Sequence, residues 1–470
     1  MLPALCVWRK IAYIGRMRRT SWLLLAAAGL FHLAMLVGWR FQTPLVPYFF
    51  DATVLTGGRG IDFYSIYQAG YNARHGVDIY ENDPARAPIV VPHFTPYRYL
   101  PPVAYTAGAA LSLLPSLTAY KVWLVVVELT LLGCVALAWR SARDRRLAML
   151  LSAMWLAFTP YYLELFMGQF SLVQAALIFG LLLMATDATR QTDAGLTALR
   201  AGALWLASVI WKINTVIFAP VFLRLRRWRT LLVSGLLLVV VSAPYFAVFP
   251  AHGLDFLRNN FGGGVSTYEL GNLGFRQLVF EALADLGAPA AVQSFFQAFT
   301  IVAILCVCLG LTFPVRLVWN TAGADEARSG TYGGRRIFSF GHLTAFYPEA
   351  DPPVATLLCL WLAAYFLISP QIWEDHYVML LPALAICLRQ SWGKAEAWFV
   401  WLVWLLVALP TPFGFTSLPA QIMANHDLRG FPLHPAWQPL LEHASKAIPT
   451  LLFFIYLARR PARLSSLKTT

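Results

Sequence analysis

Charged residues are scarce in this chain. They make up 13% of its 470 residues, about half of the roughly 25% found in soluble domains, which argues against a large soluble core. Hydrophobic residues reach 59% and fall into long continuous runs. A membrane β-barrel would instead show alternation over segments of about 10 residues. The composition therefore predicts an all-α polytopic membrane protein embedded in a lipid bilayer.

Several functional motifs are also missing. The six cysteines have no metal-binding spacing, and most lie in apolar runs, where a thiol behaves as a small apolar side chain. The sequence has no glycine-rich nucleotide motif and no Asp-x-Asp pair in its predicted outer loops. The net charge of +13 forms no basic stripe interleaved with aromatic residues, so we expect no nucleic-acid partner.

Basic residues cluster beside the apolar runs, as they do in cytoplasmic membrane loops. A basic stretch before the first run, at 22–39, indicates an uncleaved signal anchor with a cytoplasmic N-terminus. We treat 1–470 as a single membrane domain. Counting the basic clusters along the chain gives outer segments at 40–98, 249–289 and 411–446, and a cytoplasmic loop at 314–354.

One stretch admits two interpretations. The basic clusters Arg140–Arg146 and Arg224–Arg229 should both be cytoplasmic, yet three apolar runs separate them, the last at 200–223. Two clusters on the same side require an even number of crossings. Either one run does not cross the membrane or one loop breaks the charge rule. The short run 99–115 raises the same question.

A carboxylate follows the first apolar run among aromatic residues. Asp62 is close in sequence to Tyr64 and Tyr67. A carboxylate in such surroundings can have a raised pKa and act as a general base, and aromatic rings bind the faces of sugars. The alternative is an interfacial aromatic belt around a solvated aspartate.

Several polar residues are candidates for binding an anion. Arg98, at the start of a run, can pair with a phosphate or anchor the interface. Lys212 lies mid-run, where a lysine needs a partner or a wet cavity unless it snorkels. Gln169 follows a glycine that interrupts an apolar stretch, which indicates a helix break lining a cavity or a plain turn. Arg276, in an outer segment, is a weaker phosphate candidate.

A second polar cluster lies between two late apolar runs, at 369–377. It contains Trp373, Glu374, Asp375 and His376. His376 can donate to a phosphate or orient a base. A capped turn is the alternative, but two adjacent acids at a membrane surface favour a function.

These motifs together resemble glycosyltransferase family 87 in their order and spacing, from about residue 55 to 390. Two positions depart from the family pattern: Ser171 stands where the family has Asn, and Asp375 replaces the first residue of a His-His pair. The matching segments are Asp62–Gly70, Asp78–Tyr80, Tyr99–Pro102, Gly168–Gln169, Lys212 with the basic loop after it, and Ser369–Tyr377.

The resemblance implies a GT-C-type bundle of about 10–13 transmembrane helices with outer-face loops. It implies a hexosyltransferase of the plasma (inner) membrane whose site faces the periplasm or exterior. A sugar, typically mannose, would pass with inversion from a polyprenyl-phosphate donor to a glycolipid or glycan acceptor. Asp62 would act as the general base. Arg98, Lys212, Arg276 or His376 would stabilise the leaving phosphate.

A lipid phosphate leaves without a nucleotide, so with these motifs missing we predict no cofactor and no essential metal. The competing hypothesis is a transporter or flippase for a polyprenyl-linked or other anionic lipid. A transporter should show internal symmetry and midplane charges. The chain has no symmetry that we detect, and its polar clusters fall on one predicted face.

Overall fold

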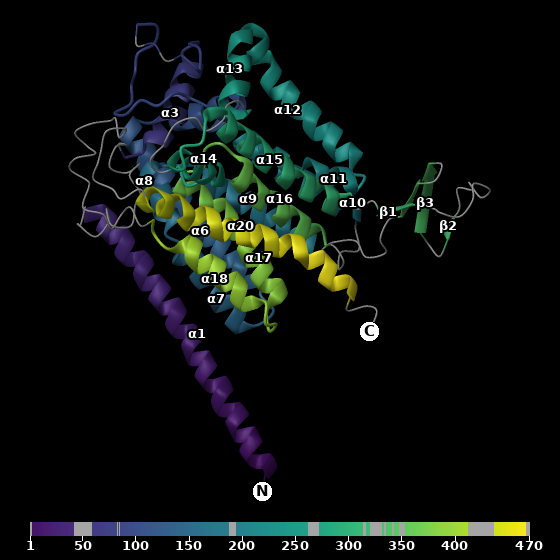
Figure 1. Ribbon diagram of the computed structural model, residues 1–470. Coiled ribbons are helices and arrows are strands. Elements are labelled where there is room, and N and C mark those ends of the chain that lie inside the picture. The colour runs from purple at the N-terminus through teal and green to yellow at the C-terminus, as the bar shows by residue number, and fades with distance from the viewer. Residues whose placement is uncertain are drawn as a thin grey trace.

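Helices form almost all of the regular structure in the computed structural model (Figure 1). Within the described residues, four helical segments are long and apolar enough to cross a membrane, or five if a pair of helices bent by 45° is counted as one span. The structure describes residues 2–41, 59–81, 83, 85–187, 194–261, 272–313, 316–319, 331–332, 335–340, 343–346, 353–411 and 437–466. The segments are Thr20–Phe41 of α1 (Leu2–Phe41), α6 (Ser116–Ser141), α12 (Trp228–Val248), α15 (Ala290–Thr312) and the pair α7 (Arg145–Leu156) and α8 (Pro160–Met167).

The long helices present apolar side chains outward. On α12, Leu232 and Leu236 are 69% and 65% exposed, and on α15 Phe295 is 63% exposed. Such a surface is unfavourable in water but suits lipid. The shorter apolar helices α9 (Ser171–Asp187), α16 (Val354–Ile368) and α17 (Leu381–Ser391) lie mostly inside the bundle. The chain is a multi-pass membrane protein.

The apolar run 200–223 does not continue in one direction. It consists of α10 (Ala194–Trp211), the 3₁₀-helix η4 (Ile213–Phe218) and α11 (Ala219–Arg224). The indole of Trp205 donates to the carbonyl of Thr215 at 2.9 Å and stacks on Phe222 with ring centroids 4.6 Å apart. The chain therefore turns back between α10 and η4, and its two halves lie side by side. This fold agrees with the first of the two interpretations, in which one run does not cross.

The run 99–115 also contains only a short helical part. Its helical part, α4 (Pro101–Val103), the π-helical turn η2 (Ala104–Gly108) and α5 (Ala109–Leu111), covers 101–111. That length rises about 17 Å, against a hydrocarbon core of about 30 Å.

The helix α3 (Ile61–Arg74) packs on η2 backbone to backbone. A Cβ atom on Gly70 would lie 1.9 Å from the carbonyl carbon of Gly108, so only glycine fits there. This contact fixes α3, which carries Asp62.

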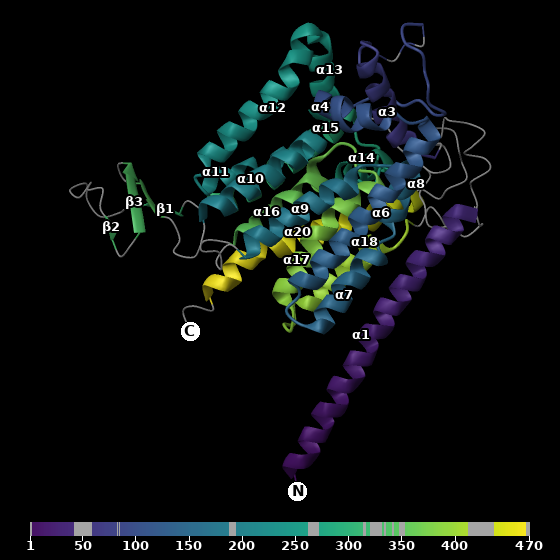
Figure 2. The same ribbon diagram turned by 180° about the vertical axis from the view of Figure 1, so that it is seen from behind.

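Some of the remaining elements lie at the ends of the bundle, and others pack within it (Figure 1). The helices α3, α8 and α13 gather at one end, away from a small sheet (Figures 1 and 2). The sheet is antiparallel, in the order β1-β4-β3-β2, and lies within the predicted loop 314–354. Bounds are α13 (Pro250–Phe261), α14 (Phe275–Asp285), β1 (Arg316–Trp319), β2 (Thr331–Tyr332), β3 (Arg335–Phe340), β4 (Leu343–Phe346), η5 (Glu374–Leu380), α18 (Ala397–Ala408) and α20 (Trp437–Ser466).

Parts of the predicted outer segments, at 42–58, 262–271 and 412–436, lie outside the described residues. The predicted segment 411–446 also contains the start of α20, which begins at Trp437.

Candidate active site

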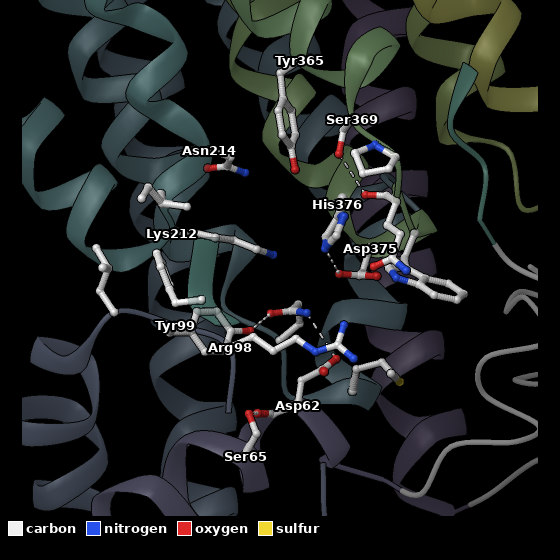
Figure 3. A pocket seen from close by; sticks show the side chains of 18 of the residues that line it. Asp62, Ser65, Arg98, Tyr99, Lys212, Asn214, Tyr365, Ser369, Asp375 and His376 are labelled. Carbon is white, nitrogen blue, oxygen red and sulfur yellow. Dashed lines mark hydrogen bonds and ion pairs between the residues drawn. The ribbon is translucent and has the colours of Figure 1, made fainter. Parts of the chain in front are cut away.

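A cavity of about 680 Å³ brings most of the predicted site residues together, although they come from distant parts of the sequence (Figure 3). Asp62 lies on α3, Lys212 at the break between α10 and η4, and Asp375 in η5. The predicted residues that line the cavity are Asp62, Arg98, Gln169, Lys212, Arg276, Trp373, Asp375 and His376.

Asp62 is held at the start of α3 by the turn after α8. Gly60, at the N-cap, has a left-handed φ of 75°, and its N–H donates to the carbonyl of Phe166 at 2.9 Å. Gln169 then reaches Asp62, and its Nε2 donates to Oδ2 of the carboxylate at 3.2 Å. The Gln169 Oε1 accepts from the Tyr99 hydroxyl and from the backbone N–H of Phe170. These two donors orient the amide, so its Nε2 faces Asp62.

The carboxyl of Asp62 titrates close to neutral pH. Burial raises its pKa to about 6, although the charges of Lys212 and Arg98 act in the opposite direction. At pH 7 the group is mostly ionised, yet it accepts a proton far more readily than a solvated aspartate. This combination suits a general base.

Lys212 lies where the apolar run turns back. Its backbone is extended, with φ −154° and ψ 117°, and the side-chain amide of Gln174 donates to its carbonyl at 2.7 Å. Gln174 therefore satisfies a backbone group that the break leaves open. The ammonium donates to the Ser171 hydroxyl at 3.1 Å and points into the cavity (Figure 3). The structure therefore gives Lys212 a cavity and a partner, in place of snorkelling to lipid.

Asp375 and His376 form another wall of the cavity (Figure 3). Burial raises the pKa of Asp375 to about 7, with the Lys212 charge lowering it and the Asp62 charge adding to the rise. Within the described protein, Oδ2 of Asp375 and Nδ1 of His376 have no hydrogen-bond partner. The Asp375 Oδ2 lies 3.7 Å from Nε2 of His376, so the two side chains face each other at this wall.

His376 does not fit the expectation that it supplies a cation. Burial, together with the nearby Lys212 ammonium, lowers its pKa well below its usual value. It is a neutral imidazole at pH 7, so it contributes a hydrogen bond in place of a charge.

The two arginines differ in their environment. Arg98 is exposed at the cavity rim. Arg276 is only 6% exposed, and its guanidinium donates to Oε1 of Gln297 at 3.1 Å and to the carbonyl of Ile368 at 3.4 Å. Arg98 is therefore the more adaptable of the two, and Arg276 is held rigidly.

Tyr64, Tyr67 and Glu374 do not line the cavity. In a helix, positions two and five residues after Asp62 point to other faces. The Tyr64 ring accordingly packs on Tyr120, with centroids 5.7 Å apart, and the Tyr67 hydroxyl donates to the carbonyl of Leu114 at 2.7 Å. Glu374 faces away from the cavity and pairs with a lysine of α20. The structure therefore does not bring these three predicted site residues to the cavity.

The cavity also contains residues that were not predicted as site residues from the sequence. Tyr99, Asn214, Tyr365 and Ser369 line it. The Tyr365 side chain lies near Asn214 and Ser369 in the cavity (Figure 3). Its only signal in the sequence is a phenol within an apolar run, four residues before Ser369 and so on the same helical face.

The sequence model of glycosyltransferase family 87 matches residues 98–332, half of the chain. The chain belongs to this family. The resemblance seen in the motifs is thereby confirmed, and the protein is a membrane glycosyltransferase.

The chain is similar in sequence to a mannosyltransferase and in structure to ArnT. The chain is 26% identical over 392 residues to the polyprenol-phosphate-mannose-dependent alpha-(1-2)-phosphatidylinositol mannoside mannosyltransferase of Mycolicibacterium smegmatis, covering 82% of this chain and 79% of the relative. ArnT from Cupriavidus metallidurans bound to undecaprenyl phosphate covers 91% of this chain and 78% of its own, at 13% identity and a TM-score of 0.38. Its apo form has the same TM-score at 14% identity.

Proposed function

We propose that this family 87 enzyme transfers a sugar, most simply mannose, from a polyprenyl phosphate to an acceptor hydroxyl. The observation that carries the proposal is the cavity in which the Asp62 carboxylate, with a pKa of about 6, faces the Lys212 ammonium. One group is suited to take a proton and the other to receive an anion. We also assign the bundle to the GT-C class because of its family.

The reaction needs a single displacement. The acceptor oxygen attacks the anomeric carbon as its proton passes to Asp62. The new glycosidic bond forms on the face opposite the phosphate, so the anomeric configuration inverts. The bond from the anomeric carbon to the phosphate oxygen breaks, and both of its electrons leave with the polyprenyl phosphate. The chemistry uses the residues of this chain alone.

The cationic side chains stabilise the leaving phosphate. Lys212 and Arg98 carry positive charge into the cavity, where low polarity strengthens their attraction to a developing anion. Arg276 lines the same cavity. Another part of the lining is apolar, with Ile217 and Phe256 among its residues. The amphipathic lining suits a molecule that joins an anionic head to a polyprenyl chain.

Asp375 and His376 are suited to holding the sugar. Both line the cavity, one with a carboxyl group that accepts hydrogen bonds and the other with a neutral imidazole. Sugar hydroxyls can donate to the first and pair with the second. Trp373, which also lines the cavity, offers a flat apolar surface for a sugar face.

We place the reaction at the outer, periplasmic face of the inner membrane. The charge pattern supports this orientation because every basic cluster then falls on the cytoplasmic side. The two short or folded-back runs remove the conflict in that count. Mannose is proposed because the Mycolicibacterium smegmatis relative is named as polyprenol-phosphate-mannose-dependent. A glycolipid or glycan is the proposed acceptor.

A transfer assay tests the function directly. We expect the purified enzyme in liposomes to move radiolabel from polyprenyl-phosphate-mannose to a glycolipid extract. Polyprenyl-phosphate-arabinose in parallel reactions tests the choice of sugar. Movement of labelled donor between leaflets without any labelled product would favour a flippase and contradict the proposal.

The pH profile of the enzyme should report the base. We expect kcat/KM to fall on acidification through about pH 6, because protonated Asp62 cannot accept the acceptor proton. Above that pH the carboxylate is ionised and the rate levels off with respect to this group. An acid limb near pH 4, the usual range of a solvated carboxyl, would contradict the assignment. Initial rates at saturating acceptor and subsaturating donor from pH 3.5 to 8 provide the measurement.

A further inference from the structure

Two ionisable side chains of the C-terminal helix α20 are completely buried although they do not line the cavity. His443 and Lys446 are both 0% exposed. They are three residues apart, so they lie on one face of the helix. A buried ionisable group is unfavourable unless it is paired. The pairs that these two residues make lead to the two chain segments that wall the cavity.

Lys446 fixes the residue next to Asp375. Its ammonium lies 3.3 Å from Oε1 of Glu374. It also donates to the carbonyls of Val407, at 2.7 Å, and Leu409, which close the end of α18. The other carboxylate oxygen of Glu374 accepts from the Thr411 hydroxyl at 3.3 Å. Glu374 is thus held on the α20 side, and its neighbour Asp375 faces the cavity.

His443 fixes the other segment. Its Nδ1 lies 2.5 Å from the carbonyl oxygen of Asn272, and its Nε2 lies 3.0 Å from Oε1 of Glu281 on α14. Asn272 in turn holds the segment that precedes Asp375. Its Nδ2 donates to the carbonyl of Pro370 at 2.9 Å, and its Oδ1 accepts from the N–H of Ile372 at 3.0 Å.

The two segments are also joined to each other through the backbone. The N–H of Leu273 donates to the carbonyl of Ile372 at 2.7 Å, and Asn272 and Trp373 form an antiparallel bridge. The Tyr377 hydroxyl donates to the carbonyl of Leu273 at 2.9 Å. One face of α20 therefore contacts a hydrogen-bonded unit that presents Arg276, Asp375 and His376 to the cavity.

We propose that α20 is a clamp on the active site, with His443 and Lys446 as positioning residues that act through Asn272 and Glu374. The inference rests on the proposed transferase function and adds residues to it. Buried ion pairs contribute little net stability compared with apolar side chains. Here they fix positions, because each pair connects α20 to a residue close in sequence to one that lines the cavity.

The test separates positioning from simple loss of a buried charge. In the double variant Lys446→Met/Glu374→Gln both charges disappear, so no unpaired ion remains and the protein is expected to fold. We expect amide hydrogen exchange in peptides covering 370–376 to become at least about tenfold faster. Exchange in α6 should not change. Wild-type exchange in 370–376 would overturn the proposal, and this readout does not depend on any assumed activity.

Kinetics provide the second readout. We expect kcat of the folded double variant to fall about 10- to 100-fold, since small displacements of positioned groups have effects of that size. KM for polyprenyl-phosphate-mannose should change less than about threefold, because Lys212 and Arg98 are untouched. Wild-type kcat in the double variant would overturn the clamp. If the wild-type enzyme shows no transfer activity, the proposed function is contradicted but the clamp is not. Hydrogen exchange then tests the clamp by itself.

Two further variants complete the design. Lys121→Met makes the same chemical change at an exposed lysine of α6 and should behave as wild type in both readouts. Glu374→Gln removes one charge. Its amide oxygen can stay beside the Lys446 ammonium, and its NH2 group can donate to the Thr411 hydroxyl. It is the fallback if the double variant does not fold. We expect it to raise exchange in 370–376 about threefold or more, and exchange equal to wild type would count against the clamp.

Discussion

Asp62→Asn is expected to lower kcat by about 10²- to 10⁴-fold, the range that general base catalysis contributes. The amide has almost the shape of the carboxylate, and its oxygen still accepts from Gln169. It cannot take the acceptor proton at any pH near neutrality. Binding of the donor should persist or tighten, because a negative charge near the phosphate has been removed. A fall in kcat with an unchanged or lower donor KM would therefore identify the base.

The matched control for this variant is Asp83→Asn, at an exposed aspartate in the same outer segment. It makes the same change of charge and should leave turnover unaltered. Size-exclusion profiles and thermal unfolding in detergent confirm that both variants fold. Turnover at the wild-type rate by folded Asp62→Asn would remove Asp62 from the base role.

Lys212→Met should lower kcat by about 10²- to 10³-fold, comparable to the removal of one preorganised group that stabilises a transition-state charge. The methionine keeps the length of the side chain and loses the charge. The donor KM should also rise, since the ammonium attracts the phosphate before the reaction. Lys121→Met again serves as the control. Wild-type kcat and donor KM in folded Lys212→Met would assign the lysine a structural role.

Lys212→Met should also change the pH profile of the enzyme. The Lys212 charge lowers the pKa of Asp62 against the effect of burial. Without it the pKa of Asp62 should rise, so the acid limb of kcat/KM should move to higher pH. A folded variant with lower activity and an unmoved acid limb would show that Lys212 does not act on Asp62 through its charge.

The order of motifs along the chain was sufficient to predict the class of protein and most of the cavity. A charged residue within or beside an apolar run is costly in lipid and therefore rare. Positions such as Asp62, Lys212 and Asp375 can for this reason be recognised in the sequence. The resemblance to family 87 rests on the same positions. Both the helical membrane bundle and the family were therefore predictable before any contact was known.

Side-chain direction was not predictable in the same way. Tyr64 and Glu374 are close in sequence to Asp62 and Asp375, but helix geometry and packing turn them to other faces. The protonation state of His376 was missed because it depends on burial and on the Lys212 ammonium, neither of which sequence proximity reveals. The role proposed for Lys446 was also hidden, since its partner lies on another element.

The sequence by itself determined that this protein is a helical membrane glycosyltransferase of family 87, because hydrophobic length and motif order are properties of the chain in one dimension. Only the tertiary structure decided where the run around Lys212 turns back. That turn depends on contacts such as Trp205 with Thr215 and Gln174 with the Lys212 carbonyl. Contacts between distant residues replace the hydrogen bonds that a straight helix would have made, and no local pattern encodes them.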